Sequence, residues 1–127
     1  MTPEVEAALE EIRRGLPDNA VAARDDGEGG AYVSVDGVAI GPPWAQTTTW
    51  VGFRIPFSYP YADVYPHFVR GDLSRADNGA LGEALSATTF DGRSAIQISR
   101  RSNHRDPGVE TALLKLLKVI DWLRHRP

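Results

Sequence analysis

Basic and titratable side chains are concentrated in the polar run SRRSNHRD, which spans residues 99–106. Three arginines and one histidine fall within six residues of it: Arg100, Arg101, His104 and Arg105. Guanidinium groups bind carboxylates through paired hydrogen bonds, so this run could dock an acidic partner surface or a carboxylate tail. His104 could act as a general base or proton carrier, because imidazole titrates near neutral pH. The alternative for all four residues is ordinary solvated charge in a loop.

Nucleophiles and metal ligands are scarce in this sequence. It contains no cysteine, which excludes disulfides, thiolate metal sites and thiol nucleophiles. Ser94 is a candidate nucleophile, although an unactivated hydroxyl is a poor one near neutral pH. His67 and His125 are far apart in sequence and lack the spacing of metal ligands. We expect no metal site and no cofactor, and we expect the acidic segment 25–28 to form a turn.

Two groups of aromatic residues are candidates for contacting a partner. Trp44, in the segment GPPW, is a candidate exposed anchor because Pro42 and Pro43 order the loop at low entropic cost. A second group lies in IPFSYPYADVYP, residues 55–66, where three prolines make a helix unfavourable. We expect these rings to pack a rigid corner, and Phe57 is also a candidate for binding a partner.

A small set of strands must position these residues. Alternation of apolar and polar side chains predicts strands at 31–41, 47–55 and 67–71, the first of which is either one bulged strand or a small hairpin. A weaker strand signal covers residues 20–23. Because the connections are short, we expect an antiparallel four-stranded meander.

Two helices and a long loop complete the predicted fold. The first helix begins at Thr2, and its apolar residues recur at helical spacing as far as Leu16. Turn-forming residues dominate 72–92, which predicts a long surface loop, and the alternating segment 94–99 follows it. A last helix is expected to begin at Asp106 and to pack on the sheet. Its predicted apolar face consists of Val109, Ala112, Leu113, Leu116, Leu117, Ile120 and Leu123.

Length and composition indicate a single domain over residues 1–127, and the predicted helices and strands make it an α+β domain. Of the 127 residues, 42% are hydrophobic and 24% are charged, which is typical of a globular protein. The net charge of -3 argues against a nucleic-acid binder, which needs a basic face for phosphate contacts. No apolar stretch approaches the roughly 18 residues of a membrane span, and the acidic N-terminus differs from a signal peptide. We therefore expect a cytoplasmic protein that binds no membrane.

The order of these elements resembles the ubiquitin-conjugating-enzyme-like (UBC/RWD) superfamily. In that superfamily a YP...P element follows the third strand, and IPFSYPYADVYP is similar to it. The segment FDGRSAIQISRRSNHRDPGVETALLKLLKVIDWL is similar to the bacterial group called prokaryotic E2 family E, in which a strand, an SR-rich turn and a PG-D/E helix start follow one another. The matching residues are Ser99, Arg100, Pro107, Gly108 and Glu110. The resemblance implies a UBC-like fold and three partners: a ubiquitin-like protein, an activating-enzyme-like protein and a JAB-type peptidase.

The chain departs from that superfamily at its nucleophile. A typical conjugating enzyme carries ubiquitin as a thioester on cysteine, after a His-Pro-Asn tripeptide that helps to stabilise the oxyanion. This chain has neither feature, and Ala95 falls at the cysteine position when GRSAIQI is laid on the family's pattern. Ala95 is either the natural residue or the replacement of a removed nucleophile.

Two functions follow from the resemblance. The one we prefer is a non-catalytic adaptor that binds a ubiquitin-like protein, an activating enzyme or both, through exposed aromatic residues and the arginine-rich run. The alternative is a carrier, a transferase of a ubiquitin-like protein, whose nucleophile was removed at Ala95 or is replaced by Ser94 or His104. A third interpretation is a small-molecule or effector-type domain that shares only an α+β arrangement, because fold alone does not establish function.

Overall fold

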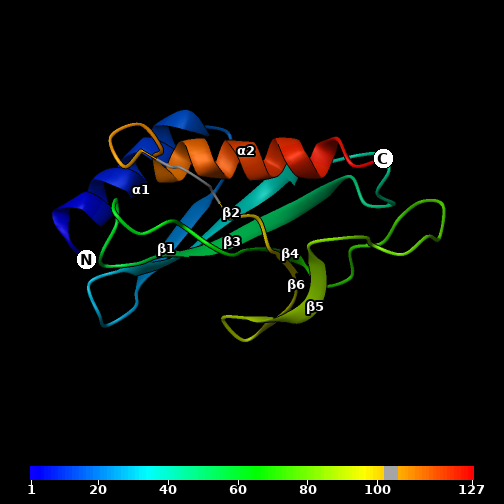
Figure 1. Cartoon of the computed structure of the whole chain (residues 1–127), viewed down its shortest axis with the longest axis horizontal. Helices are drawn as coiled ribbons and strands as arrows, with labels where there is room; N and C mark the ends of the chain where they lie inside the picture. Colours follow the sequence, from blue (N-terminus) through cyan, green and yellow to red (C-terminus); the bar gives the residue numbers. More distant parts are fainter. Residues whose placement is uncertain (102–105) are drawn as a thin grey trace.

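The computed structural model of the chain describes residues 1–101 and 106–127. Over these residues the fold is α+β, with two helices and one antiparallel six-stranded sheet (Figure 1). In chain order the elements are α1 (Pro3–Gly15), β1 (Val21–Asp25), β2 (Ala31–Ala39), β3 (Thr48–Ile55), β4 (His67–Arg70), β5 (Leu85–Phe90), β6 (Arg93–Ile98) and α2 (Ala112–Arg124). Neither helix in the described part of the chain is long and apolar enough to cross a membrane.

The sheet extends the predicted meander by two strands. Its order is β1-β2-β3-β4-β6-β5, so the first four strands are consecutive neighbours, as predicted. The prediction of four strands is wrong, because part of the expected surface loop at 72–92 forms β5 and pairs with β6. A two-residue turn joins these strands at Asp91 and Gly92, whose φ angles of 49° and 78° suit a tight hairpin. The segment 31–41 is one bulged strand rather than a hairpin, with its register shift between Val35 and Val38.

Both helices cover the same face of the sheet (Figure 1). Thr2 caps α1, since its hydroxyl accepts a hydrogen bond from the Val5 amide at 3.2 Å. The last helix begins later than predicted: Thr111 caps α2 by accepting from the Leu114 amide, whereas Asp106 closes a turn before it. One hydrophobic core joins α1, the sheet and α2.

The predicted apolar face of the last helix is partly wrong. Val109 precedes the helix and is exposed, and Leu117 is also exposed. Lys115 and Val119 are buried instead. The buried positions repeat three, four and seven residues apart, and Leu117 lies outside that stripe because it is about 100° around the helix from its neighbour Leu116.

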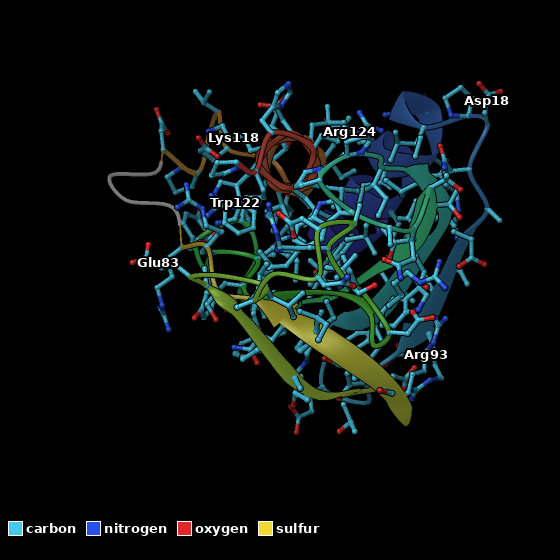
Figure 2. The ribbon with its side chains drawn as sticks, turned by 90° about the vertical axis from the view of Figure 1, so that its right-hand side faces the viewer. Asp18, Glu83, Arg93, Lys118, Trp122 and Arg124 are labelled. Atoms are coloured by element: carbon cyan, nitrogen blue, oxygen red, sulfur yellow. The ribbon has the colours of Figure 1, made fainter. Side chains whose placement is uncertain are left out.

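The β5–β6 hairpin, drawn in yellow-green tones in Figure 2, lies on the side of the sheet away from the helices. Phe90 stacks on Phe68 with ring centroids 4.5 Å apart and lies against Trp50 and Tyr32. A Cβ atom at Gly52 would lie 2.6 Å from the Phe90 ring, so the glycine lets that ring pack directly on β3. These four aromatic residues form a second, smaller apolar cluster.

Candidate anion-binding pocket

A small pocket lies between α2 and the chain that leaves β6. We call it the cationic pocket, and it is lined by Arg100, Arg101, Glu110, Lys115, Lys118, Val119 and Trp122. Its volume is about 190 Å³. Sites for whole small molecules usually measure about 300–1,000 Å³, so this pocket has room for a single carboxylate or phosphate group rather than a complete cofactor.

Helical spacing brings one wall of the pocket together. Lys115, Lys118 and Trp122 are separated by three and four residues, so their side chains lie along one face of α2. In Figure 2, Lys118 and Trp122 lie on the same side of this helix and Arg124 lies on the other. The Thr111 cap fixes where the helix begins, and the packing of its buried stripe on the core sets which residues face the pocket.

The opposite wall is supplied by two arginines that follow β6. The Arg100 guanidinium lies over the Trp122 ring, 5.3 Å from its centroid, and that of Arg101 lies 4.2 Å from the centroid of Tyr65. Within residues 1–101 and 106–127, neither arginine forms an ion pair with a carboxylate. A ring beneath a guanidinium restrains its position and leaves its N–H groups available in the plane. Both guanidinium groups are therefore restrained in position, and their N–H groups can donate hydrogen bonds to a ligand.

The two lysines of the pocket differ in their burial and in the carboxylate that pairs with each ammonium group. Lys115 is only 5% exposed, and its ammonium forms an ion pair with Asp63 at 2.9 Å. Lys118 is exposed and forms an ion pair with Glu110. The lining thus carries four cationic side chains against one carboxylate, although the whole chain has a net charge of -3. The pocket is a local positive region that favours an anionic ligand.

The imidazole of His67 is buried in the core, near enough to Lys115 to sense its charge, and packs against Phe53 with ring centroids 5.2 Å apart. The pKa of His67 is lowered to about 3, chiefly because burial disfavours the charged imidazolium and also because of the nearby charge of Lys115, with Asp63 partly opposing both effects. Neither ring nitrogen has a hydrogen-bond partner in the described structure. His67 is therefore a neutral core residue and contributes no charge to the pocket at neutral pH.

The structure separates the residues predicted to bind a partner. Arg100 and Arg101 line the pocket, whereas the predicted His104 and Arg105 lie outside the described residues. Phe57 is 62% exposed on the proline-rich corner and is not part of the pocket lining. The prediction that Trp44 is an exposed anchor is wrong: it is 3% exposed, because its ring packs in the core and its indole N–H donates to the Leu123 carbonyl at 2.9 Å.

Two of the candidate catalytic positions, Ser94 and Ala95, lie on β6 and are not part of the lining of the cationic pocket. Ala95 is 1% exposed, in the interior of the sheet between Arg70 of β4 and Thr88 of β5. Ser94 is exposed and lines a second cavity of about 500 Å³. Within the described part of the chain, no hydrogen bond links the Ser94 hydroxyl to a basic side chain. The arginine of that cavity, Arg70, is already engaged by the Asp72 carboxylate.

Sequence reasoning missed the α2 wall of the cationic pocket. The signal was present, because Lys115 interrupts an otherwise apolar stripe and is followed by Lys118 and Trp122 at helical spacing. Across the described residues, no group of three histidine, aspartate or glutamate side chains is arranged to hold a metal ion.

No family model, curated protein or solved structure matches this chain. Its function is therefore inferred from the geometry of the cationic pocket and from the sequence resemblance.

Proposed function

We propose that this protein is a non-catalytic adaptor that holds a carboxylate of a partner protein, either an acidic side chain or a chain terminus, in the cationic pocket. The observation that carries this proposal is the pair Arg100 and Arg101. Both are exposed, both lie over aromatic rings, and neither is neutralised by a carboxylate of the described residues. Arginine in this setting presents several N–H groups that match the two oxygens of a carboxylate.

The UBC/RWD resemblance supports a particular class of partner. It favours a ubiquitin-like protein or an activating-enzyme-like protein of a bacterial ubiquitin-like conjugation pathway in the cytoplasm, with a JAB-type peptidase as a further partner. A UBC-like arrangement of the helices and the sheet belongs to the same proposal. The burial of Ala95 supports an adaptor over a carrier, because a carrier needs an accessible nucleophile at the position that the family uses.

The test is a binding titration with a fluorescent acidic peptide that has a free C-terminal carboxylate, followed by fluorescence anisotropy. We expect saturable binding that weakens with added salt. The double substitution Arg100→Ala/Arg101→Ala should weaken it at least about tenfold, because hydrogen bonds to charged groups contribute about 1.5–3 kcal/mol each. The matched control is Arg13→Ala/Arg14→Ala, which removes two adjacent exposed arginines from α1 and should leave the affinity unchanged.

Two results would contradict the adaptor. The first is the absence of saturable binding, or an equal loss of affinity in the α1 control. The second concerns the carrier alternative and uses the chain with activating enzyme, ATP and a ubiquitin-like protein: a covalent adduct mapped by mass spectrometry to this chain, at Ser94, His104 or another residue, would establish a carrier.

A further inference from the structure

Within residues 1–101 and 106–127, the strand β5 is an edge of the sheet with no strand paired to its outer side. It is last in the strand order, and Ser86 to Thr89 are all exposed. Its sequence, LSATTF, contains no charged residue and no proline. The opposite edge, β1, ends in Arg24 and Asp25, and the latter binds the N-terminal amine. Charges and prolines on edge strands prevent pairing with other chains, and β5 has neither.

The hydrogen-bond register shows which backbone groups of β5 point outward. The Ser99 amide donates to the Ala84 carbonyl at 2.9 Å, which makes these two residues a hydrogen-bonded pair beside the β5–β6 ladder. Because such pairs alternate along antiparallel strands, Ser86, Thr88 and Phe90 direct their backbone groups to β6. The N–H and C=O groups that point away from the sheet belong to Leu85, Ala87 and Thr89.

We propose that β5 pairs with β5 of a second copy of this chain, in antiparallel orientation about a two-fold axis at Ala87. This register places Ala87 opposite Ala87 and Leu85 of each copy opposite Thr89 of the other. All three outward-facing residues are then hydrogen-bonded, and the two sheets become one continuous sheet.

The absence of charge on β5 favours a second copy as the occupant. A charged edge would set like charges opposite each other across a two-fold axis, whereas alanine, threonine and leucine do not. The three outward-facing residues supply equal numbers of donors and acceptors, so the strand is complementary to itself. A contact between two six-residue strands is small beside the roughly 1,200–2,000 Å² of a stable interface, so we expect a weak dimer that depends on concentration.

The test is the molar mass in solution, measured by sedimentation equilibrium from micromolar to millimolar protein. The wild type should pass from the monomer mass of 13.9 kDa toward twice that mass. Ala87→Lys and Ala87→Glu should each remain monomeric, because like charges meet at the two-fold axis, whereas an equimolar mixture of the two should dimerise again. The control Ala22→Lys, on the exposed edge of β1, should dimerise like the wild type.

Three outcomes would overturn the proposal. One is a monomer mass at every concentration, and another is a dimer that persists in Ala87→Lys or does not return in the mixture. The third is a monomer whose Leu85, Ala87 and Thr89 amides become protected from hydrogen exchange only when an unrelated extended peptide is added, which would assign the edge to a foreign strand.

Discussion

The buried imidazole of His67 makes the stability of this protein depend on pH in a specific window. In the unfolded chain its pKa is the ordinary 6.5, and burial lowers the pKa of the folded state to about 3. Between these values the unfolded chain binds a proton that the folded protein does not, so acid favours unfolding. The free energy of unfolding is therefore highest above pH 6.5 and decreases progressively as the pH falls toward 3.

The magnitude follows from the separation of the two pKa values. At about 1.4 kcal/mol per pKa unit, the free energy of unfolding should fall by about 5 kcal/mol across the whole window, with a slope of about 1.4 kcal/mol per pH unit inside it. The aspartates with lowered pKa values, such as Asp72 and Asp77, have an ordinary pKa of 3.8 in the unfolded chain, so their contribution to the pH dependence begins below about pH 5. The interval from pH 6.5 to about pH 5 therefore separates the contribution of His67 from that of these aspartates.

The assay is urea unfolding followed by tryptophan fluorescence at several pH values between 7.5 and 4.5. His67→Leu should abolish most of the slope and keep the stability at pH 7.5, because it removes two buried ring nitrogens that have no hydrogen-bond partner in the described structure. The control His125→Leu changes an exposed histidine after α2 and should keep the slope. A flat wild-type profile, or a slope that survives in His67→Leu, would refute the reasoning.

Two further substitutions test the packing around the sheet. Gly52→Ala should destabilise the fold by about 1–3 kcal/mol in urea unfolding, because its Cβ would meet the Phe90 ring at 2.6 Å; an unchanged free energy of unfolding would show that the β5–β6 tip does not pack there. Trp44→Phe should cost about 1–3 kcal/mol, because it removes the indole donor to the Leu123 carbonyl, and a neutral effect would contradict that buried hydrogen bond.

The parts of the fold that sequence predicted are those with strong periodicity. The apolar residues of α1 recur at helical spacing, and β2 and β3 alternate clearly, so these elements and their antiparallel order were predictable. The strand β5 was not, because its exposed residues are small or polar and only Leu85 and Phe90 carry an apolar signal. The strand is held by backbone pairing with β6 and by the packing of Phe90 on aromatic residues that are far away in sequence. A pattern within a few neighbouring residues contains neither contribution.

About half of the candidate site could be predicted from the sequence. Arg100 and Arg101 were recognised because their charges are adjacent in sequence, and the structure places both at the pocket. Lys115 was missed because a lysine within an apolar helix is normally assigned to solvent, whereas here Asp63, far away in sequence, compensates its burial. Trp44 was assigned to the surface because a stiff loop can present an anchor, yet the same stiffness holds its ring against the core.

The most direct test of the cationic pocket uses the three tryptophans as reporters. Trp122 lines the pocket, Trp50 lines the larger cavity, and Trp44 is buried elsewhere in the core. The measurement is the indole N–H region of an NMR spectrum during titration with an acidic peptide that has a free C-terminal carboxylate. We predict that only the Trp122 resonance moves saturably during the titration, and that this movement is absent in Arg100→Ala/Arg101→Ala. Movement of the Trp50 resonance in its place, or no movement at all, would contradict carboxylate binding in the cationic pocket.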